Sequence, residues 1–177
     1  GGFCVFNGLA LVAYALPKLT IAVLDCDEHG GDGTEAFAKR LSNLHTFSVF
    51  GSRFGVRGGL RSRAFQVPGA GKPEINTLYL EVINQALTEV LAVTPDLVVY
   101  QAGMDSHKND PRATLKVSTA TLARRDKVVF DTFSQAQIPV LGVLAGSYQG
   151  EPQVRKLYRN LLLAAGNSSD NAHLHRC

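Results

Sequence analysis

The chain of 177 residues is long enough to bury the core of one domain, and its content of 45% hydrophobic and 19% charged residues is that of an ordinary soluble globular protein. The 18 basic and 15 acidic residues leave a net charge of only +3, and no dense basic stripe is interleaved with aromatic residues. This composition argues against direct binding of nucleic acid and against a disordered or fibrous chain.

The first predicted elements alternate between helix and strand. Residues 3–16 predict a helix rich in small apolar side chains, which is too short to span a bilayer and lacks the basic start and cleavage pattern of a signal peptide. The apolar run Thr20–Leu24 suits a buried strand, residues 34–43 suit a helix, and Thr46–Val49 predict a short strand. A loop rich in Gly and Arg follows, from residue 51 to about residue 76.

The second half of the chain repeats this plan. Apolar residues at helical spacing from Leu80 to Leu91 are followed by the predicted strand Leu97–Tyr100. A further helix carries an apolar face from Leu122 to Phe133, and the strand Val140–Leu144 comes after it. The last predicted helix covers roughly residues 152–165 and ends at a glycine. Helices between wholly apolar strands predict an α/β domain with a parallel sheet covered on both faces.

Polar, glycine-containing sequence follows each of three strong apolar strands. These segments are DCDEHGGDG after Leu24, QAGMDSHKNDP after Tyr100 and AGSYQGEP after Leu144. In open parallel sheets, ligands gather beyond the carboxyl ends of the strands. We therefore expect these three segments to converge on one rim of the sheet.

The first two of these segments predict a metal centre. Asp27 and His29 are two residues apart, so on extended backbone their side chains point to the same side. A mixed oxygen and nitrogen donor set suits zinc or Fe(II) better than magnesium or calcium. Asp105 is the natural third ligand, and a set of three leaves one coordination position open, as in catalytic zinc sites. The alternative interpretation is an acidic turn in which Asp32 caps the next helix, with Asp105 on a surface loop.

Four strings in chain order resemble the histone deacetylase superfamily, which also includes acetylpolyamine amidohydrolases and acetoin-utilisation proteins. They are GGFCVFNGLAL, LDCDEHGGDGT, PDLVVYQAGMDSHKNDP and LARRDKVVF…IPVLGVLAGSY. The resemblance implies a three-layer arginase/deacetylase fold with a central parallel sheet. We interpret residues 1–165 as the C-terminal, metal-binding part of such a domain, without its N-terminal strands, and residues 166–177 as a polar tail.

The resemblance also implies roles for individual residues. Asp27, His29 and Asp105 match the three zinc ligands of the family. Tyr148, in AGSY, matches the tyrosine that hydrogen-bonds the substrate carbonyl and its oxyanion.

Further matched residues surround these four. Gly2 and Phe3 match residues that line the narrow tunnel for the acetylated side chain, and Asp25 and Asp32 match the acids that orient two tandem catalytic histidines. A structural monovalent cation, usually potassium, is expected near five residues: Asp25, Asp27, His29, Ser48 and Val49.

The sequence departs from the family pattern in several places. Gly30 stands where a second histidine or a glutamine usually follows the ligand, and Ala145-Gly146-Ser147 replaces the usual run of glycines before the tyrosine. The loop after Ser48 lacks the usual Phe-Pro-Gly, which leaves open whether Phe54 forms the second tunnel wall.

The histidines and one basic pair have the following expected positions. The paired catalytic histidines of the family lie just upstream of GGFC, where this chain has none of its five histidines. We expect His107 on an exposed loop, His173 and His175 in a solvated tail, and Arg124-Arg125 with Asp126 as an exposed charged group on a helix.

The function implied is zinc-dependent hydrolysis of the acetyl amide of acetyl-lysine in a protein or histone. Two alternatives stay open: a catalytically silent metal-binding fragment or pseudoenzyme, and an amidohydrolase for acetylated small amines such as polyamines. Without the tandem histidines, we expect little deacetylase activity from residues 1–177 and an exposed apolar sheet edge or helix face near the N-terminus.

Composition and the absence of membrane features indicate the cellular setting, and the resemblance implies the partner. Three cysteines without CxxC spacing argue against a disulfide framework and favour a reducing compartment. We expect a cytoplasmic protein, or a nuclear one in a eukaryote, whose partner is an acetylated peptide or amine rather than nucleic acid or a membrane. The oligomeric state stays open.

Overall fold

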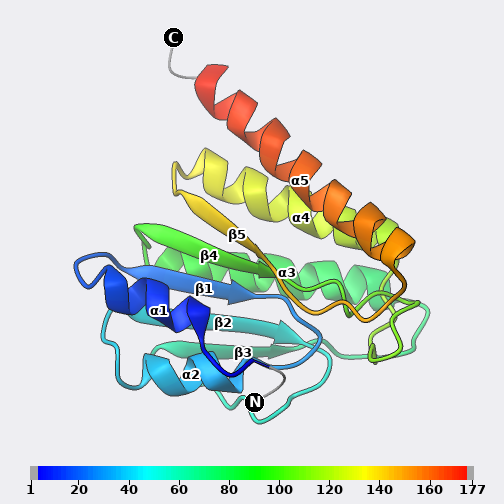
Figure 1. Cartoon of the computed structure of the whole chain (residues 1–177), viewed down its shortest axis with the longest axis horizontal. Coiled ribbons are helices and arrows are strands. Elements are labelled where there is room, and N and C mark those ends of the chain that lie inside the picture. Colours follow the sequence, from blue (N-terminus) through cyan, green and yellow to red (C-terminus); the bar gives the residue numbers. More distant parts are fainter. Residues whose placement is uncertain (1–3, 175–177) are drawn as a thin grey trace.

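The structure is a computed structural model that describes the backbone of residues 4–174 and the side chains of residues 4–168. Its centre is one five-stranded sheet in the order β3-β2-β1-β4-β5, and every neighbouring pair is parallel (Figure 1). The strands are β1 Ile21–Asp25, β2 Leu44–Phe50, β3 Ser62–Gln66, β4 Leu97–Ala102 and β5 Val140–Leu144. The prediction of a parallel α/β sheet is therefore confirmed.

Helices cover both faces of the sheet and make three layers (Figure 1). The helices are α1 Gly8–Ala15, α2 Asp32–Ala38, α3 Ile75–Ala92, α4 Thr119–Gln135 and α5 Glu151–Leu174. The first two pack on one face and the other three on the opposite face. Among the described residues, no helix combines the length and apolar character that a membrane crossing needs.

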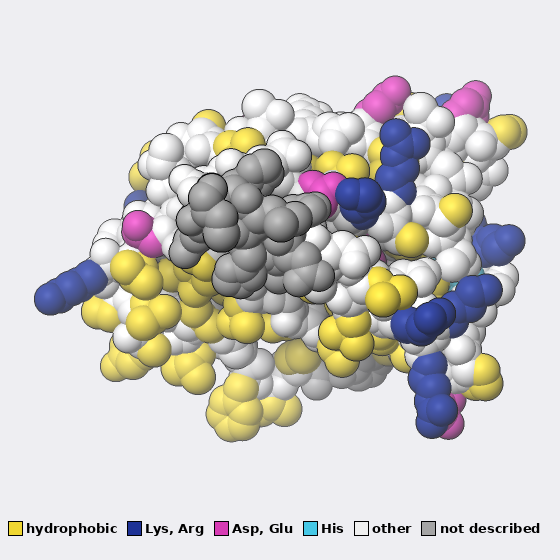
Figure 2. All heavy atoms as spheres, turned by 90° about the horizontal axis from the view of Figure 1, so that it is seen from above, with side chains coloured by type: hydrophobic (Ala, Val, Ile, Leu, Met, Phe, Trp, Pro, Cys, Tyr) yellow, Lys and Arg dark blue, Asp and Glu magenta, His cyan; other side chains and the backbone are white. Residues whose placement is uncertain are grey.

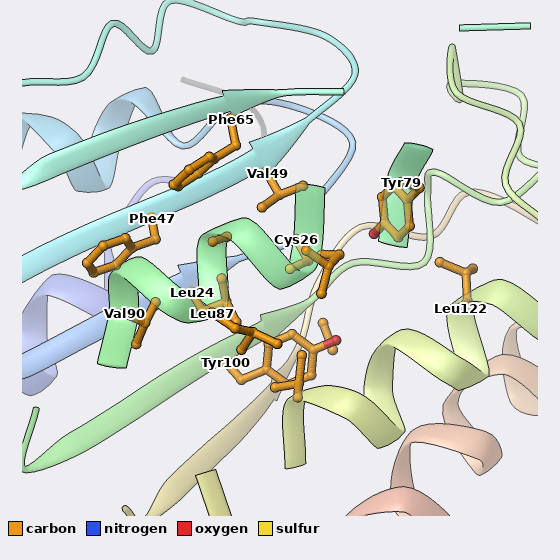
Figure 3. Packing of buried hydrophobic residues seen from close by; sticks show 14 of the residues in the cluster. Leu24, Cys26, Phe47, Val49, Phe65, Tyr79, Leu87, Val90, Tyr100 and Leu122 are labelled. Atoms are coloured by element: carbon orange, nitrogen blue, oxygen red, sulfur yellow. The ribbon is translucent and has the colours of Figure 1, made fainter. Parts of the chain in front are cut away.

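Alternation along the strands divides the core into two clusters. Ala22 and Leu24 of β1 point into the larger cluster with α3, α4 and α5, part of which Figure 3 shows. Ile21 and Val23 point into the smaller cluster, where Ala10 of α1 contributes. Because successive side chains of a strand face opposite sides, a strand covered on both faces must be apolar throughout. This is why β1 is recognisable as a continuous apolar run.

Two elements differ from the sequence-based expectation. β3 lies within the segment that was expected to be a loop. This edge strand was not predicted because its alternating pattern is short and includes the exposed Arg63. The last helix continues past Gly166 to Leu174, so the expected stop there was wrong. A glycine inside a helix costs only about 1 kcal/mol relative to alanine. Here Ser168 also holds the helix against α4, because its hydroxyl donates to Asp131 at 2.8 Å.

An apolar surface remains exposed beside the sheet. β5 is an edge strand, and its Leu141 and Leu144 are exposed, the latter by 66%. On α1, Leu11 and Tyr14 are also exposed, the latter by 72%. Figure 2 shows hydrophobic side chains gathered along one side of the molecule. The expectation of an exposed apolar sheet edge or helix face near the N-terminus is confirmed by the exposed side chains of α1.

Candidate metal centre

Asp27, His29 and Asp105 meet beyond the carboxyl ends of β1 and β4. These strands are parallel neighbours, with Asp25 opposite Gln101 in the register, so the loops that follow them start side by side. Nδ1 of His29 lies 3.1 Å from Oδ1 of Asp27 and 3.1 Å from Oδ2 of Asp105. One ligand atom from each of the three residues lies within 4.8 Å of the others. The predicted convergence of these three residues is confirmed.

The charges around this point are those that a divalent cation would neutralise. Asp105 is fully buried. Burial and the negative charge of Asp27 raise the pKa of Asp105 to about 8. A cation of charge +2 would offset both the loss of water and the repulsion between the two carboxylates. The donor set, two carboxylates and one imidazole, fits zinc or a similar transition metal.

Backbone N–H groups orient the carboxylates of the centre. The N–H of Glu28 donates to Oδ1 of Asp105 at 2.9 Å, and the N–H of His29 donates to Oδ1 of Asp27 at 3.0 Å. Such supporting hydrogen bonds fix the direction of ligand oxygens and are a regular part of metal sites. The second oxygen of Asp105 is left facing His29.

The loop after β5 reaches the same centre through Gly146. Its backbone N–H donates to Oδ2 of Asp27 at 3.0 Å, and its carbonyl accepts from the N–H of Met104 at 2.7 Å. A Cβ atom at this position would lie 2.3 Å from Oδ2 of Asp105 and 2.6 Å from Oδ2 of Asp27. Only glycine allows so close an approach of backbone to the two carboxylates. The loops after β1, β4 and β5 therefore converge as predicted.

Tyr148 shares a groove of about 1290 Å³ with Asp27 and His29. The N–H of Tyr148 donates to Oδ2 of the buried Asp110 at 2.7 Å, and the guanidinium of Arg112 lies 4.7 Å from the centre of the tyrosine ring. Burial, followed by the negative charges of Asp27 and Asp105, raises the pKa of the Tyr148 hydroxyl. The hydroxyl is therefore held protonated near neutral pH, as a hydrogen-bond donor must be.

Asp25, the last residue of β1, stands opposite Ser48 of β2. Oδ1 of the buried Asp25 accepts hydrogen bonds from the N–H of Asp27 and from the side chain of Gln101. Burial, then the charge of Asp27, raises the pKa of Asp25 to about 7. The hydroxyl of Ser48 accepts from the N–H of Gly31 at 3.1 Å. The binding of a monovalent cation here stays a prediction.

The other residues that were predicted for the site lie in different elements of the fold. Val49 is buried in β2, next to Ser48, and Asp32 is the first residue of α2 and half-buried. Phe54 lines the groove, and its ring meets the His29 ring edge-on, with 5.8 Å between centroids, so it is placed to form a wall beside the candidate ligand. Gly2 and Phe3 lie outside the described residues.

Three residues that were expected on the surface are fully buried: His107, Arg125 and Asp126. The ring nitrogens of His107 contact Gln149 and Thr119, and burial lowers its pKa. Arg125 and Asp126 follow the core residue Leu122 by three and four positions, which places them on the same helical face. This spacing was the signal that could have revealed them.

Glu28 was also missed as a functional residue. It stands between the predicted ligands Asp27 and His29, is fully buried, and accepts hydrogen bonds from Thr114. A buried carboxylate cannot be recognised from a position in an acidic run, because neighbouring acids in such a run are usually solvated.

Comparison with known proteins finds a matching family and related proteins from several organisms. The family profile described as "Histone deacetylase domain" matches residues 1–164. An uncharacterised protein of Picosynechococcus sp. is 31% identical over 157 residues, which cover 83% of this chain and 50% of that protein. Histone deacetylase 2 of Arabidopsis thaliana is 28% identical, over 84% of this chain and 40% of its own length. Acetylpolyamine amidohydrolase of Mycoplana ramosa is 26% identical, over 92% of this chain and 50% of its own length.

The fold agrees with that of a solved structure. The crystal structure of an acetylpolyamine aminohydrolase from Burkholderia pseudomallei matches with a TM-score of 0.81 and 24% sequence identity, covering 94% of this chain and 51% of that one. The chain thus has the arginase/deacetylase fold and spans about half the length of the relatives that it matches. Since the family profile matches residues 1–164 of 177, this chain belongs to the histone deacetylase superfamily.

Proposed function

We propose that this chain supplies the metal-binding part of a zinc-dependent deacetylase that hydrolyses the acetyl amide of acetyl-lysine. The observation that supports this most directly is the convergence of Asp27, His29 and Asp105 within 4.8 Å. Asp27 and His29 line an open groove that Tyr148 also lines. Three protein ligands leave room for substrate and water, as in catalytic zinc sites.

The roles of the chain's own residues follow from their positions. Asp27, His29 and Asp105 would hold the cation, which when bound supplies Lewis acidity to polarise the acetyl carbonyl and acidify water. Tyr148 would donate a hydrogen bond to the oxyanion that develops on the carbonyl oxygen, which is typically worth about 2.7–4 kcal/mol in the transition state. Asp110 and Arg112 hold that tyrosine at the groove.

The proton acceptor for the attacking water is not among the described histidines. His45 lies in β2, and both ring nitrogens of His107 are engaged by Gln149 and Thr119. We propose that two tandem histidines from a segment outside residues 1–177 supply this role in the intact protein, oriented by Asp25 and Asp32. Both acids line the groove beside Asp27.

A second candidate is an amidohydrolase for acetylated polyamines, which is favoured by the similarity to two proteins of that name. The metal centre and Tyr148 would act identically on either substrate, because both present an acetyl amide. The groove beyond the metal would decide between them. Arg112 stands at its edge over Tyr148, and a fixed positive charge there disfavours a polycation more than a neutral peptide.

Metal binding is tested on the purified chain by metal analysis after equilibration with zinc. We expect one zinc per chain in the wild type and strong loss of zinc in Asp27→Asn and Asp105→Asn. Glu81→Gln, which removes an exposed carboxylate on α3, is the matched control and should keep its zinc. Equal zinc contents in all four proteins would refute the centre.

The substrate is tested on the intact natural protein, with acetyl-lysine peptides and acetylpolyamines compared by kcat/KM. A preference for the peptide supports the proposal, and a preference for the polyamine supports the second candidate. Normal zinc content with no hydrolysis of either compound would support a catalytically silent metal-binding protein instead.

A further inference from the structure

Arg125 and Asp126 of α4 form a fully buried ion pair. Nε and Nη2 of Arg125 lie 2.9 Å and 2.8 Å from Oδ1 of Asp126, which also accepts the hydroxyl of Tyr100 at 2.6 Å. These contacts fix the plane of the guanidinium and leave its other terminal nitrogen, Nη1, directed elsewhere. Nothing in the proposed chemistry uses this pair.

Nη1 of Arg125 reaches the backbone of the two loops that carry the carboxylate ligands. It donates to the carbonyl of Gly103 at 2.7 Å and lies 3.5 Å from the carbonyl of Cys26. It also donates to the hydroxyl of Tyr79 at 3.1 Å. Cys26 directly precedes Asp27, and Gly103 comes two residues before Asp105. Cys26, Tyr79 and Tyr100 belong to the larger core cluster, in which Figure 3 labels them.

These contacts lie where the sheet can no longer hold the two loops together. The last backbone hydrogen bond between the β1 and β4 segments runs from the N–H of Cys26 to the carbonyl of Gln101, at 3.0 Å. Beyond it, the carbonyls of Cys26 and Gly103 have left the ladder and need donors, since a buried carbonyl without a partner is costly. Nη1 of Arg125 lies between these two carbonyls, 2.7 Å from that of Gly103 and 3.5 Å from that of Cys26.

We infer that Arg125 is a positioning residue of the metal centre, which holds Asp27 and Asp105 at the separation that a divalent cation requires by bridging the carbonyls of Cys26 and Gly103. This inference rests on the proposed metal site. A planar guanidinium with fixed donors can bind Asp126 on one side and two carbonyls on the other, whereas the single ammonium of lysine cannot. Loss of such supporting contacts typically lowers metal affinity about 10- to 100-fold.

The test compares Arg125→Lys with the wild-type chain in Co²⁺ binding, measured by visible absorption at a temperature where circular dichroism shows both proteins folded. We expect Arg125→Lys to bind Co²⁺ about 10- to 100-fold more weakly and to show an altered absorption spectrum, since the ligand geometry changes. Arg124→Lys, the same substitution at the exposed neighbouring residue, is the matched control. Tyr100→Phe is a second control, because it removes a hydrogen bond from Asp126 without touching either carbonyl.

The outcomes separate positioning from a purely structural role. If Arg125→Lys is less stable but its folded form binds Co²⁺ with the wild-type affinity and spectrum, the inference is wrong. If Tyr100→Phe loses as much affinity as Arg125→Lys, the effect belongs to the core as a whole and the inference is also wrong. If Arg125→Lys does not fold, Asp126→Asn, which removes the charge that anchors the guanidinium, is judged by the same criteria. A wild-type chain that binds no Co²⁺ or zinc overturns the proposed metal site itself.

Discussion

Oε1 of Glu28 accepts two hydrogen bonds from Thr114, one from the backbone N–H at 2.9 Å and one from the hydroxyl. Glu28 is fully buried between the candidate ligands Asp27 and His29. Its other oxygen, Oε2, has no hydrogen-bond partner among the described residues. The contact joins the loop after β1 to the loop after β4, so one carboxylate ties the metal motif to the segment that leads to α4.

Removal of this carboxylate should destabilise the fold. Glu28→Ala removes the acceptor of both hydrogen bonds from Thr114, and the loss of a hydrogen bond to a charged group typically costs about 1.5–3 kcal/mol. Glu28→Gln keeps an oxygen at the Oε1 position and should cost much less. Urea unfolding monitored by circular dichroism measures both. Equal stabilities of the alanine variant and the wild type would contradict a tethering role.

The same residue predicts a dependence of stability on pH. Burial raises the pKa of Glu28 above its ordinary value of 4.5, so the folded state binds this proton more tightly than the unfolded state. The corresponding stability is present below pH 4.5 and is lost as the pH rises through the folded-state pKa. Glu28→Gln has no such titration, so its stability relative to wild type should increase as the pH rises. Unfolding curves measured in parallel from about pH 4 to 8 test this, and a constant difference would rule it out.

Gly146→Ala should weaken metal binding. The added Cβ would lie 2.3 Å from Oδ2 of Asp105 and 2.6 Å from Oδ2 of Asp27, so one or both carboxylates must move. Gly150→Ala is the control, since a Cβ there meets nothing within 4 Å. Zinc competition with a chromophoric chelator should show at least about a 10-fold loss of affinity for the first variant. We expect no loss for Gly150→Ala. If Gly146→Ala binds zinc as tightly as Gly150→Ala does, the metal lies elsewhere.

Tyr148→Phe in the intact natural protein should lower turnover without loss of metal. Removal of one donor to an oxyanion typically lowers kcat about 10²- to 10³-fold. Tyr14→Phe, on the exposed face of α1, is the control. Steady-state kinetics and zinc analysis on the same preparations provide both values. Unchanged turnover in the Tyr148 variant would remove this residue from the mechanism.

Residues 1–177 alone should hydrolyse acetyl-lysine peptide slowly, even when loaded with zinc. A positioned general base typically contributes about 10²- to 10⁴-fold to the rate, and both ring nitrogens of His107 are engaged by other side chains. Turnover within the ordinary enzyme range of roughly 1–10³ s⁻¹ would show that this chain contains its own proton acceptor. A hydroxamate that binds with zinc present and not without it would confirm that the centre is assembled.

Much of the candidate metal centre could be predicted from local sequence. Asp27 and His29 follow a continuous apolar run, and Asp105 follows another, so the order of strand and polar segment identified them. The parallel arrangement of β1 and β4 then brings these segments together, as the general rule for strand ends predicts. Gly146 could also be placed near the centre, because it follows the third such strand.

The burial of individual polar side chains depends on the tertiary structure. His107 and Glu28 carry polar or charged groups that are solvated in most proteins, and local sequence does not show what will cover them. For Arg125 and Asp126, the helical spacing from Leu122 indicates the buried face but not the partners. Their burial depends on partners distant in the chain, such as the carbonyl of Cys26, which is 99 residues from Arg125. Strand periodicity and polar segments thus determined which residues form the candidate metal centre. The supporting contacts required the folded chain, because each joins segments that meet only when the sheet and helices pack.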